Sequence, residues 1–295
     1  MSSSLAPATA RYVAAKGVRF NLYRSDPAEP STATPTLLLH GVPQTALCWR
    51  DAVPALATDR VVLAPDLKGL GDSEIQGPYD VATMAAELAA LILHEVDGPV
   101  DIVGHDWGGV LALAIARSRP DLIRRLVIIN APSRGVKLHQ APHVAAFAVP
   151  FIPETAFRLT GERLVRAMLH AGWRNEPPLD ADVATQYAAA YADPQRVAAM
   201  LAYYRAYAWP AVSRGLLAAA GRAVARPAPA RVRVERSLVI WGAADPVLPI
   251  SVGEAVVKDL GANCTMITLP GVGHFAVEED AAVVVPAIAD FVRAP

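Results

Sequence analysis

The feature that most constrains the fold of this chain is a glycine-rich turn at residues 104–109, GHDWGG. An apolar run (100–103) precedes the turn, and a stretch rich in alanine and leucine (110–117) follows it. This pattern predicts a strand, a sharp turn and a helix. Glycines at the first and fifth positions fit a tight, strained turn, where a Cβ atom would collide with a neighbouring strand or helix. The frame Gly-x-nucleophile-x-Gly indicates a nucleophile elbow with aspartate in place of serine.

Asp106 therefore stands where a nucleophile would, and its residue type decides the expected chemistry. A serine would form an acyl-enzyme from an ester or amide, whereas a carboxylate attacks a saturated carbon and forms an alkyl ester. The expected substrate carries an electrophilic sp3 carbon with a leaving group, such as an epoxide or an alkyl halide.

Length and composition favour one large α/β domain or one domain with an insertion. The 295 residues are 53% apolar and 19% charged, which suits a well-buried core. A net charge of −1 without a long basic run gives no electrostatic footprint for nucleic acid or an anionic membrane. The two cysteines, Cys48 and Cys264, form neither a disulfide framework nor a metal-ligand cluster, so we expect no metal and no cofactor.

Targeting segments are not expected. No run of about 20 apolar residues predicts a membrane-spanning helix. The first ten residues lack the basic and apolar regions of a signal peptide. We therefore expect a cytoplasmic protein.

Short apolar runs bounded by Gly, Pro, Asp or Asn alternate with alanine-rich helical stretches, which predicts a doubly wound, mostly parallel α/β sheet. Residues 11–14 and 18–23 are expected to add an antiparallel edge hairpin. The predicted buried strands are 36–40, 61–65, 100–103, 126–129, 237–241 and 264–269.

The alternation stops between about residues 133 and 220, where helical patterns follow one another without a convincing strand. This predicts a helical cap (133–220) inserted between two parts of a core domain, 1–132 and 221–295. The expected cap helices are 144–159, 162–171, 180–192 and 194–209.

Polar residues follow three of the predicted strands, at the sheet edge where open α/β sheets gather their active sites. The loop HGVP (40–43) follows the first of these strands, Asp245 follows a later one, and His274 follows the last. In an elbow architecture, one oxyanion-hole N–H comes from such a first loop and the other from the residue after the nucleophile. This assigns the two donors to Val42 and Trp107.

The segments HGVPQ (40–44), DLKGLGDS (66–73), GHDWGG, WGAAD (241–245) and GHF (273–275) together resemble the α/β-hydrolase-fold epoxide hydrolases and their haloalkane and haloacetate dehalogenase relatives. The resemblance spans about residues 36–292. It implies an inserted helical cap and a triad in the order Asp106, Asp245, His274. It also implies hydrolysis of an epoxide to a vicinal diol through an aspartyl ester.

An epoxide hydrolase needs an acid for the departing ring oxygen, because an alkoxide is a poor leaving group. Residues 202–205, AYYR, resemble the family's lid segment, which assigns this role to Tyr203. Tyr204 points about 100° away from Tyr203 on a helix, so we expect it to have a packing role and not to act as the acid. The family's second lid tyrosine is missing, and His143 stands about where it is expected. The alternative is that these side chains only cover the sheet.

Two departures favour epoxide over halide chemistry. Haloacetate dehalogenases carry an arginine just after the nucleophile, which this chain lacks, and haloalkane dehalogenases usually have asparagine at the position of Val42. Asn130 stands where some relatives keep an alternative acid; its amide cannot act as one, which strengthens Asp245. Two alternatives stay open: a haloalkane dehalogenase with the same triad, and a non-catalytic hydrolase-fold receptor.

The resemblance implies a small apolar epoxide and water as partners, and it leaves a homodimer open. The residues expected to form the substrate-binding surface are His40, Pro43, Phe147, Phe151, Tyr204 and Phe275.

Overall fold

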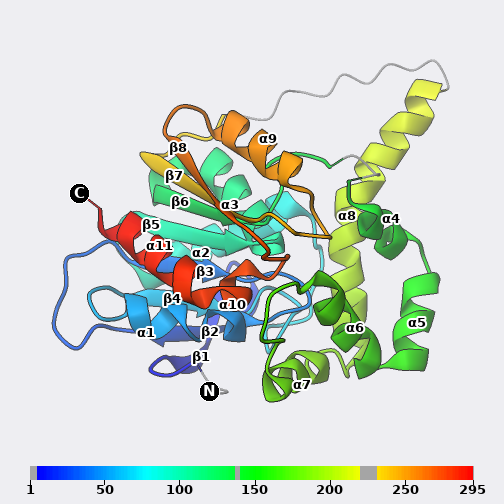
Figure 1. Cartoon of the computed structure of the whole chain (residues 1–295), viewed down its shortest axis with the longest axis horizontal. Coiled ribbons are helices and arrows are strands. Elements are labelled where there is room, and N and C mark those ends of the chain that lie inside the picture. The colour runs from blue at the N-terminus through cyan, green and yellow to red at the C-terminus, as the bar shows by residue number, and fades with distance from the viewer. Residues whose placement is uncertain (1–4, 137–139, 220–230, 295) are drawn as a thin grey trace.

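The computed structural model of the chain describes residues 5–136, 140–219 and 231–294. Its centre is an eight-stranded sheet with the strand order β1-β2-β4-β3-β5-β6-β7-β8 (Figure 1). Strands β3 to β8 pair in parallel, whereas β2 is antiparallel to both of its neighbours. The predicted mostly parallel α/β sheet is therefore confirmed. The strands are β1 (Thr9–Ala15), β2 (Val18–Ser25), β3 (Thr36–Leu39), β4 (Val62–Pro65), β5 (Val100–His105), β6 (Ile123–Ile129), β7 (Arg236–Gly242) and β8 (Cys264–Leu269).

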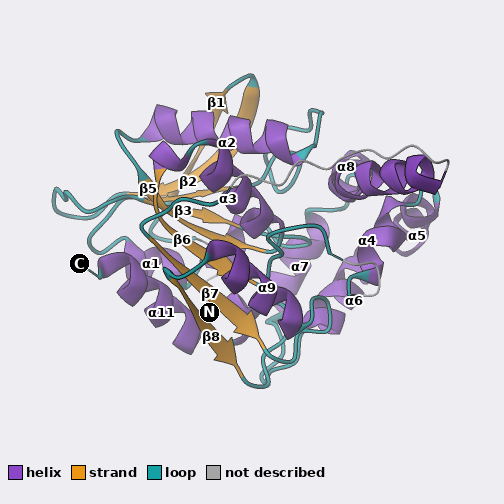
Figure 2. Ribbon diagram, turned by 90° about the horizontal axis from the view of Figure 1, so that it is seen from above, coloured by secondary structure: helices purple, strands orange, loops and turns teal. Residues whose placement is uncertain are grey.

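Helices cover both faces of the sheet (Figure 2). Every residue of β3, β4 and β5 is buried, which explains why these strands are continuous apolar runs rather than alternating ones. One face carries α1 (Ala52–Leu56) and α11 (Ala281–Arg293), and the other carries α2 (Val81–Glu95), α3 (Trp107–Ser118) and α9 (Ile250–Leu260). The short helical turns are η1 (Ala46–Trp49), η2 (Pro120–Leu122) and α10 (Ala276–Glu279).

Five further helices lie together beyond the carboxyl ends of the parallel strands (Figure 1). They are α4 (Pro142–Ala148), α5 (Ile152–Thr160), α6 (Glu162–Gly172), α7 (Ala181–Ala189) and α8 (Pro194–Ala219). Buried residues of this cap, such as Val165, Tyr187 and Met200, belong to the same apolar cluster as the sheet. The predicted return to the core at residues 220–221 lies outside the described residues, and the limits of the cap stay a prediction.

The predicted helix 144–159 is two helices, α4 and α5. Val149 precedes Pro150 and is extended, as steric contact with a following proline requires, so α4 ends there. Phe151 then has a φ of 69°, and the helical phase is lost. As a result the Phe151 side chain is 81% exposed, and the prediction that it lines the substrate-binding surface is wrong.

Within the described ranges, no helix is both long and apolar enough to cross a membrane.

Candidate active site

Asp106 sits in the turn between β5 and α3, as the elbow motif predicts. Its backbone has φ 49° and ψ −119°, a region that residues with a side chain rarely adopt. A Cβ atom on Gly104 would lie 2.5 Å from the carbonyl oxygen of Gly108, and one on Gly108 would overlap the carbonyl oxygen of Leu39. The glycine frame is therefore needed for the turn to lie against β3.

The loop after β3 contacts the Asp106 carboxylate directly. The backbone N–H of Val42 donates to Asp106 Oδ1 at 2.9 Å. A Cβ atom on Gly41 would overlap the Asp106 side chain, so glycine permits this close approach. Trp107 is the first residue of α3, directly after the nucleophile position. Its role as the second oxyanion donor stays a prediction.

His274 lies between two carboxylates. Its Nε2 is 3.5 Å from Asp106 Oδ2, and its Nδ1 is 2.8 Å from Asp245 Oδ2. The other oxygen of Asp245 accepts the N–H groups of Val247 at 2.7 Å and Leu248 at 3.0 Å. The structure thus brings together the three residues that the sequence predicts as a triad, in an order suited to a nucleophile, a base and an orienting acid.

The charges of the three groups stabilise one another. Burial alone would lower the pKa of His274, but attraction by Asp245 and the hydrogen bond to Asp106 outweigh it and raise the pKa to about 10. Burial alone would raise the pKa of Asp106, yet the hydrogen bond and charge of His274 hold that pKa below its usual value. The two carboxylates therefore favour the imidazolium form of His274 in the resting protein.

Asn130 supports Asp245, a role that the sequence analysis missed. Its Nδ2 donates to Asp245 Oδ2 at 2.7 Å, and its Oδ1 accepts the N–H of Gly242 at 3.3 Å. Asn130 directly follows β6, and Asp245 lies on the loop after the neighbouring β7. Because adjacent parallel strands end at the same edge of the sheet, this placement is the signal that could have revealed the contact.

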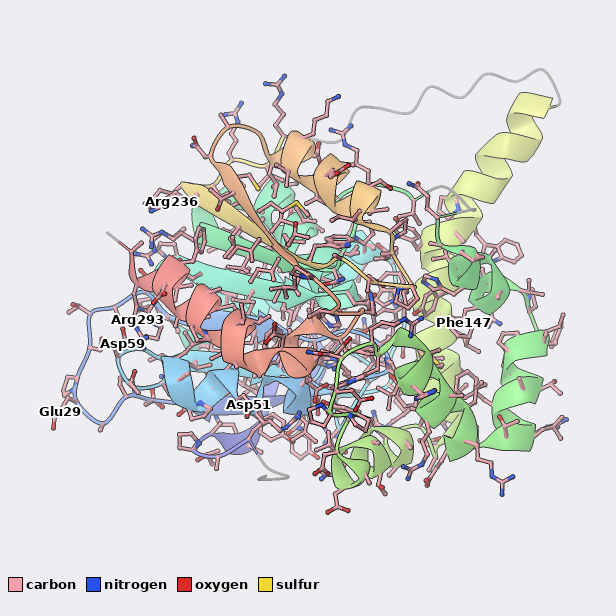
Figure 3. All side chains as sticks on the ribbon, viewed as in Figure 1. Glu29, Asp51, Asp59, Phe147, Arg236 and Arg293 are labelled. Carbon is pink, nitrogen blue, oxygen red and sulfur yellow. The ribbon has the colours of Figure 1, made fainter. Side chains whose placement is uncertain are left out.

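A cavity of about 430 Å³ lies over Asp106 and His274, between the core and the cap. Four of the predicted substrate-binding residues line it: Pro43, Phe147, Tyr204 and Phe275. Phe147 lies on the cap helix α4 (Figure 3), so the cap contributes an aromatic side chain to the lining of this cavity. Most of the other lining residues are apolar, among them Met168 and Val247. Within the described ranges, no three His, Cys, Asp or Glu side chains are grouped so as to hold a metal ion.

The structure contradicts the choice of Tyr203 as the lid acid. Its hydroxyl donates to the backbone carbonyl of Lys68 at 2.6 Å, and its buried ring stacks on Tyr79 with the centroids 5.7 Å apart. Tyr203 is not among the residues that line the cavity, whereas Tyr204 lines it together with Asp106. Because successive helical residues point about 100° apart, only one of the two tyrosines can face the nucleophile.

His143 lies at the start of α4 and lines the same cavity as Asp106 and Tyr204. Its ring meets the ring of Tyr204 edge to face, with the centroids 6.1 Å apart. Burial lowers the pKa of His143, so the ring is neutral at physiological pH. The structure therefore places a neutral histidine and a tyrosine of the cap together above the Asp106 carboxylate.

His40 does not contribute to the cavity, which corrects its prediction as a substrate-binding residue. The ring is fully buried, and its Nε2 accepts the N–H of Leu67 at 2.9 Å while its Nδ1 donates to the carbonyl of Gly41 at 2.9 Å. Both ring nitrogens are thus engaged with backbone groups. His40 joins the loop after β3 to the loop after β4.

The sheet and the elbow together define an α/β protein that presents a carboxylate between a strand and a helix. Comparison with known proteins agrees with this class. Residues 36–287 match the "Alpha/beta hydrolase family". The chain therefore belongs to the α/β hydrolase family.

Several relatives are named as epoxide hydrolases. The soluble epoxide hydrolase of Corynebacterium sp. (strain C12) is 43% identical over 112 residues, which is 37% of this chain and 39% of that protein. The AB hydrolase superfamily protein YfhM of Bacillus subtilis (strain 168) is 30% identical over 186 residues, 58% of this chain and 64% of that protein. The chain thus matches less than two thirds of the length of these curated relatives. Epoxide hydrolase A from Mycobacterium thermoresistibile has the same fold, with a TM-score of 0.78 at 22% identity over 97% of this chain and 98% of that chain.

Proposed function

We propose that this protein is an epoxide hydrolase that converts a small apolar epoxide to a vicinal diol through a covalent ester on Asp106. The observation that carries the proposal is the pairing of a carboxylate at the elbow with His143 and Tyr204 on the cap side of one cavity. The names of the relatives support the same reaction.

In the first step the Asp106 carboxylate attacks one ring carbon, and the bond from that carbon to the ring oxygen breaks. The oxygen receives the hydroxyl proton of Tyr204, while His143 holds it by a hydrogen bond. Burial, and after it the charge of Asp106, raises the pKa of Tyr204 well above 10, so the hydroxyl is protonated before the reaction. Ester formation neutralises Asp106, which makes Tyr204 a stronger acid as the proton is needed.

Once the ester has formed, the proton held by His274 passes by way of solvent to the Tyr204 phenolate. In the second step the neutral His274 takes a proton from water, and the resulting hydroxide attacks the carbonyl carbon of the Asp106 ester. The N–H groups of Val42 and Trp107 stabilise the oxyanion, and loss of one such donor costs roughly 3–4 kcal/mol in comparable sites. The ester bond breaks, the departing alkoxide takes the proton of the added hydroxyl group and leaves as the diol, and Asp106 returns to a carboxylate that keeps one oxygen from water. Since the ester no longer carries the charge that helps to raise the pKa of His274 to about 10, that pKa falls when the base is required.

The same triad would serve a haloalkane dehalogenase. A halide leaves without a proton, so Tyr204 and His143 would have no acid to supply in that reaction. Their position over Asp106 favours the epoxide. The intact triad likewise favours an enzyme over a receptor.

The test is a single turnover of a small aryl epoxide in heavy-oxygen water, with product and protein followed by mass spectrometry. The first diol should carry its new oxygen from the enzyme, and Asp106 should become labelled. His274→Gln should accumulate an adduct with the mass of the substrate, and Asp106→Asn should form none. Solvent oxygen in the first diol would contradict the covalent mechanism. Bromide release from a bromoalkane at a higher rate than diol formation would favour the dehalogenase.

A further inference from the structure

A buried carboxylate outside the triad, Glu279, joins the loop of the candidate base to the cap. We propose that Glu279 is a positioning residue: it holds loop 273–275 and cap loop 173–175 in the one arrangement that aims His274 at Asp106. This inference rests on the proposed role of His274 in hydrolysing the aspartyl ester.

The first loop that Glu279 contacts is the one that carries His274. Glu279 Oε2 accepts the backbone N–H of Gly273 at 2.8 Å, and Oε1 accepts that of Phe275 at 2.9 Å. The two residues that flank His274 are thus bound to one carboxylate. The carbonyl of His274 itself accepts a hydrogen bond from His105 Nε2 at 2.9 Å, which fixes the loop from the side of the elbow.

The second loop belongs to the cap and follows α6. Glu279 Oε2 also accepts the N–H groups of Arg174 at 2.9 Å and Asn175 at 3.1 Å. The Asn175 amide donates to the backbone carbonyl of Glu279 at 2.9 Å. Because Oε2 is shared between the two loops, a shift of the carboxylate toward one loop would weaken its hydrogen bonds to the other.

The two loops are also in direct contact. The N–H of His274 donates to the carbonyl of Gly172 at 2.8 Å. A Cβ atom on Gly273 would overlap that same carbonyl, and one on Gly172 would lie 2.5 Å from the ring of Phe275. Glycine at both positions therefore lets the cap approach the catalytic loop as closely as backbone atoms allow.

The charge of Glu279 is compensated by backbone groups. The residue is 7% exposed, and no lysine, arginine or histidine of the described residues forms an ion pair with it. Four N–H groups from two loops replace the water that a carboxylate would otherwise bind, and hydrogen bonds to a charged acceptor are strong. The carboxylate and the closed arrangement of the two loops thus stabilise each other.

The Glu279 contacts should matter more for hydrolysis of the aspartyl ester than for alkylation of Asp106. Attack by Asp106 on the epoxide does not need His274, whereas ester hydrolysis needs its Nε2 aimed at the water beside Asp106. Displacement of a reacting group by about 1 Å can cost about a hundredfold in rate. A loosened Glu279 contact should therefore slow hydrolysis more than alkylation.

The test compares Glu279→Gln with the wild-type protein by rapid quenching and mass spectrometry, using a small aryl epoxide. Glutamine keeps the shape but offers one acceptor oxygen, so its NH₂ group must face an N–H donor of one loop. Hydrolysis of the adduct should slow about tenfold or more while alkylation changes by less than about threefold, so that the adduct accumulates. Glu279→Asp keeps both acceptor oxygens and the charge, and it should recover part of the hydrolysis rate.

Glu87→Gln is the matched control, because Glu87 is similarly buried and binds Lys68 Nζ at 2.7 Å away from both loops. It should lower stability without changing the ratio of the two rates. Equal slowing of both steps in Glu279→Gln, or of neither, would overturn the positioning role. If Glu279→Gln does not fold, the ratio measured for Glu279→Asp decides. An absence of adduct in wild type and in His274→Gln would instead refute the covalent mechanism itself.

Discussion

Tyr203 and Tyr204 are neighbours in α8, but their hydroxyl groups lie in different surroundings. Tyr203 donates to a backbone carbonyl of the core, whereas Tyr204 lies in the cavity with Asp106. We expect Tyr204→Phe to slow alkylation by an epoxide about a hundredfold or more, because general acid catalysis contributes on that order. The rate of adduct formation in a single turnover measures this.

Tyr203→Phe is the matched control for that variant. It removes the same atom, but the loss leaves the buried carbonyl of Lys68 without a donor and should cost about 1–3 kcal/mol of unfolding free energy. Its alkylation rate should stay near that of wild type. A reversed pattern, with alkylation lost in Tyr203→Phe and kept in Tyr204→Phe, would return the acid role to Tyr203.

The two reaction steps should respond differently to pH. The pKa of Asp106 lies below its usual value, so the nucleophile stays ionised in mild acid. His274 must be neutral to act as the base, and its pKa in the ester lies below the value of about 10 in the resting protein because the charge of Asp106 is gone. Lowering the pH through the histidine range, near 6.5 for an unperturbed side chain, should therefore stop hydrolysis before alkylation.

The measurement is the fraction of alkylated wild-type protein at steady state between about pH 5 and about pH 8. The adduct should accumulate at the acid end and disappear at the alkaline end. His274→Gln should keep the adduct even at the alkaline end, where wild type loses it. If the two steps decline together with falling pH in wild type, His274 is not the group that limits hydrolysis.

At the scale of single residues, the sequence correctly predicted the placement of the residues whose positions are set by the strands of the sheet. It failed for a residue whose position depends on the rotation of a helix about its axis. Asp106, Asp245 and His274 each follow a parallel strand, so the topology brings them to one edge. The choice between Tyr203 and Tyr204 depends on how α8 is rotated against the core. That rotation is set by contacts such as the one to Lys68, more than a hundred residues away in the chain.

Among the elements, the elbow depends on glycine for steric reasons that can be tested. We expect Gly108→Ala to destabilise the protein by at least about 3 kcal/mol, because the added Cβ would overlap the carbonyl of Leu39 on β3, which cannot move without distorting the sheet. Urea unfolding measures the change. Gly98→Ala is the control: Gly98 has a φ of +95° but nothing within 4 Å of its Cβ position, so only backbone strain of about 1–2 kcal/mol applies. Equal losses in both variants would contradict the steric account.

Two element boundaries differ from those that hydrophobic periodicity predicts, and each has a physical reason. Periodicity predicted one helix through Pro150, but the constraint of proline on the preceding residue ends α4 at that point. In β6 the opposite happens: the strand begins at Ile123, before the apolar run, and includes Arg125. The buried guanidinium of Arg125 donates to the carbonyls of Phe291 and Ala294, so the end of α11 satisfies a charge that sequence alone would place at the surface.

Across the whole molecule, a buried polar network joins the core to the cap. Glu278 of α10 forms an ion pair with Arg50 and accepts hydrogen bonds from Gln44 of the loop after β3 and from the hydroxyl of Tyr187 in α7, the latter at 3.0 Å. Gln44, Arg50 and Tyr187 are buried, and the side chain of Glu278 is fully buried among them. The sequence offered no sign of this network, since its members are up to 234 residues apart and only Gln44, at the end of HGVPQ, belongs to a recognised motif.

Replacing Arg50 in this network should make the free energy of unfolding depend on pH. Burial raises the pKa of Glu278 even beside Arg50. Arg50→Met leaves the carboxylate without its counter-charge, which should raise the pKa further and cost about 3–5 kcal/mol near neutral pH. A carboxyl group whose pKa is higher in the folded than in the unfolded state binds more protons when folded, so stability is present at low pH and is lost as the pH rises through the folded pKa. Urea unfolding of Arg50→Met should therefore show falling stability from about pH 5 to about pH 8. The double variant Arg50→Met/Glu278→Gln removes the titrating group. It should therefore lose this pH dependence and regain part of the stability. A pH dependence that persists in the double variant would mean that another buried acid is responsible.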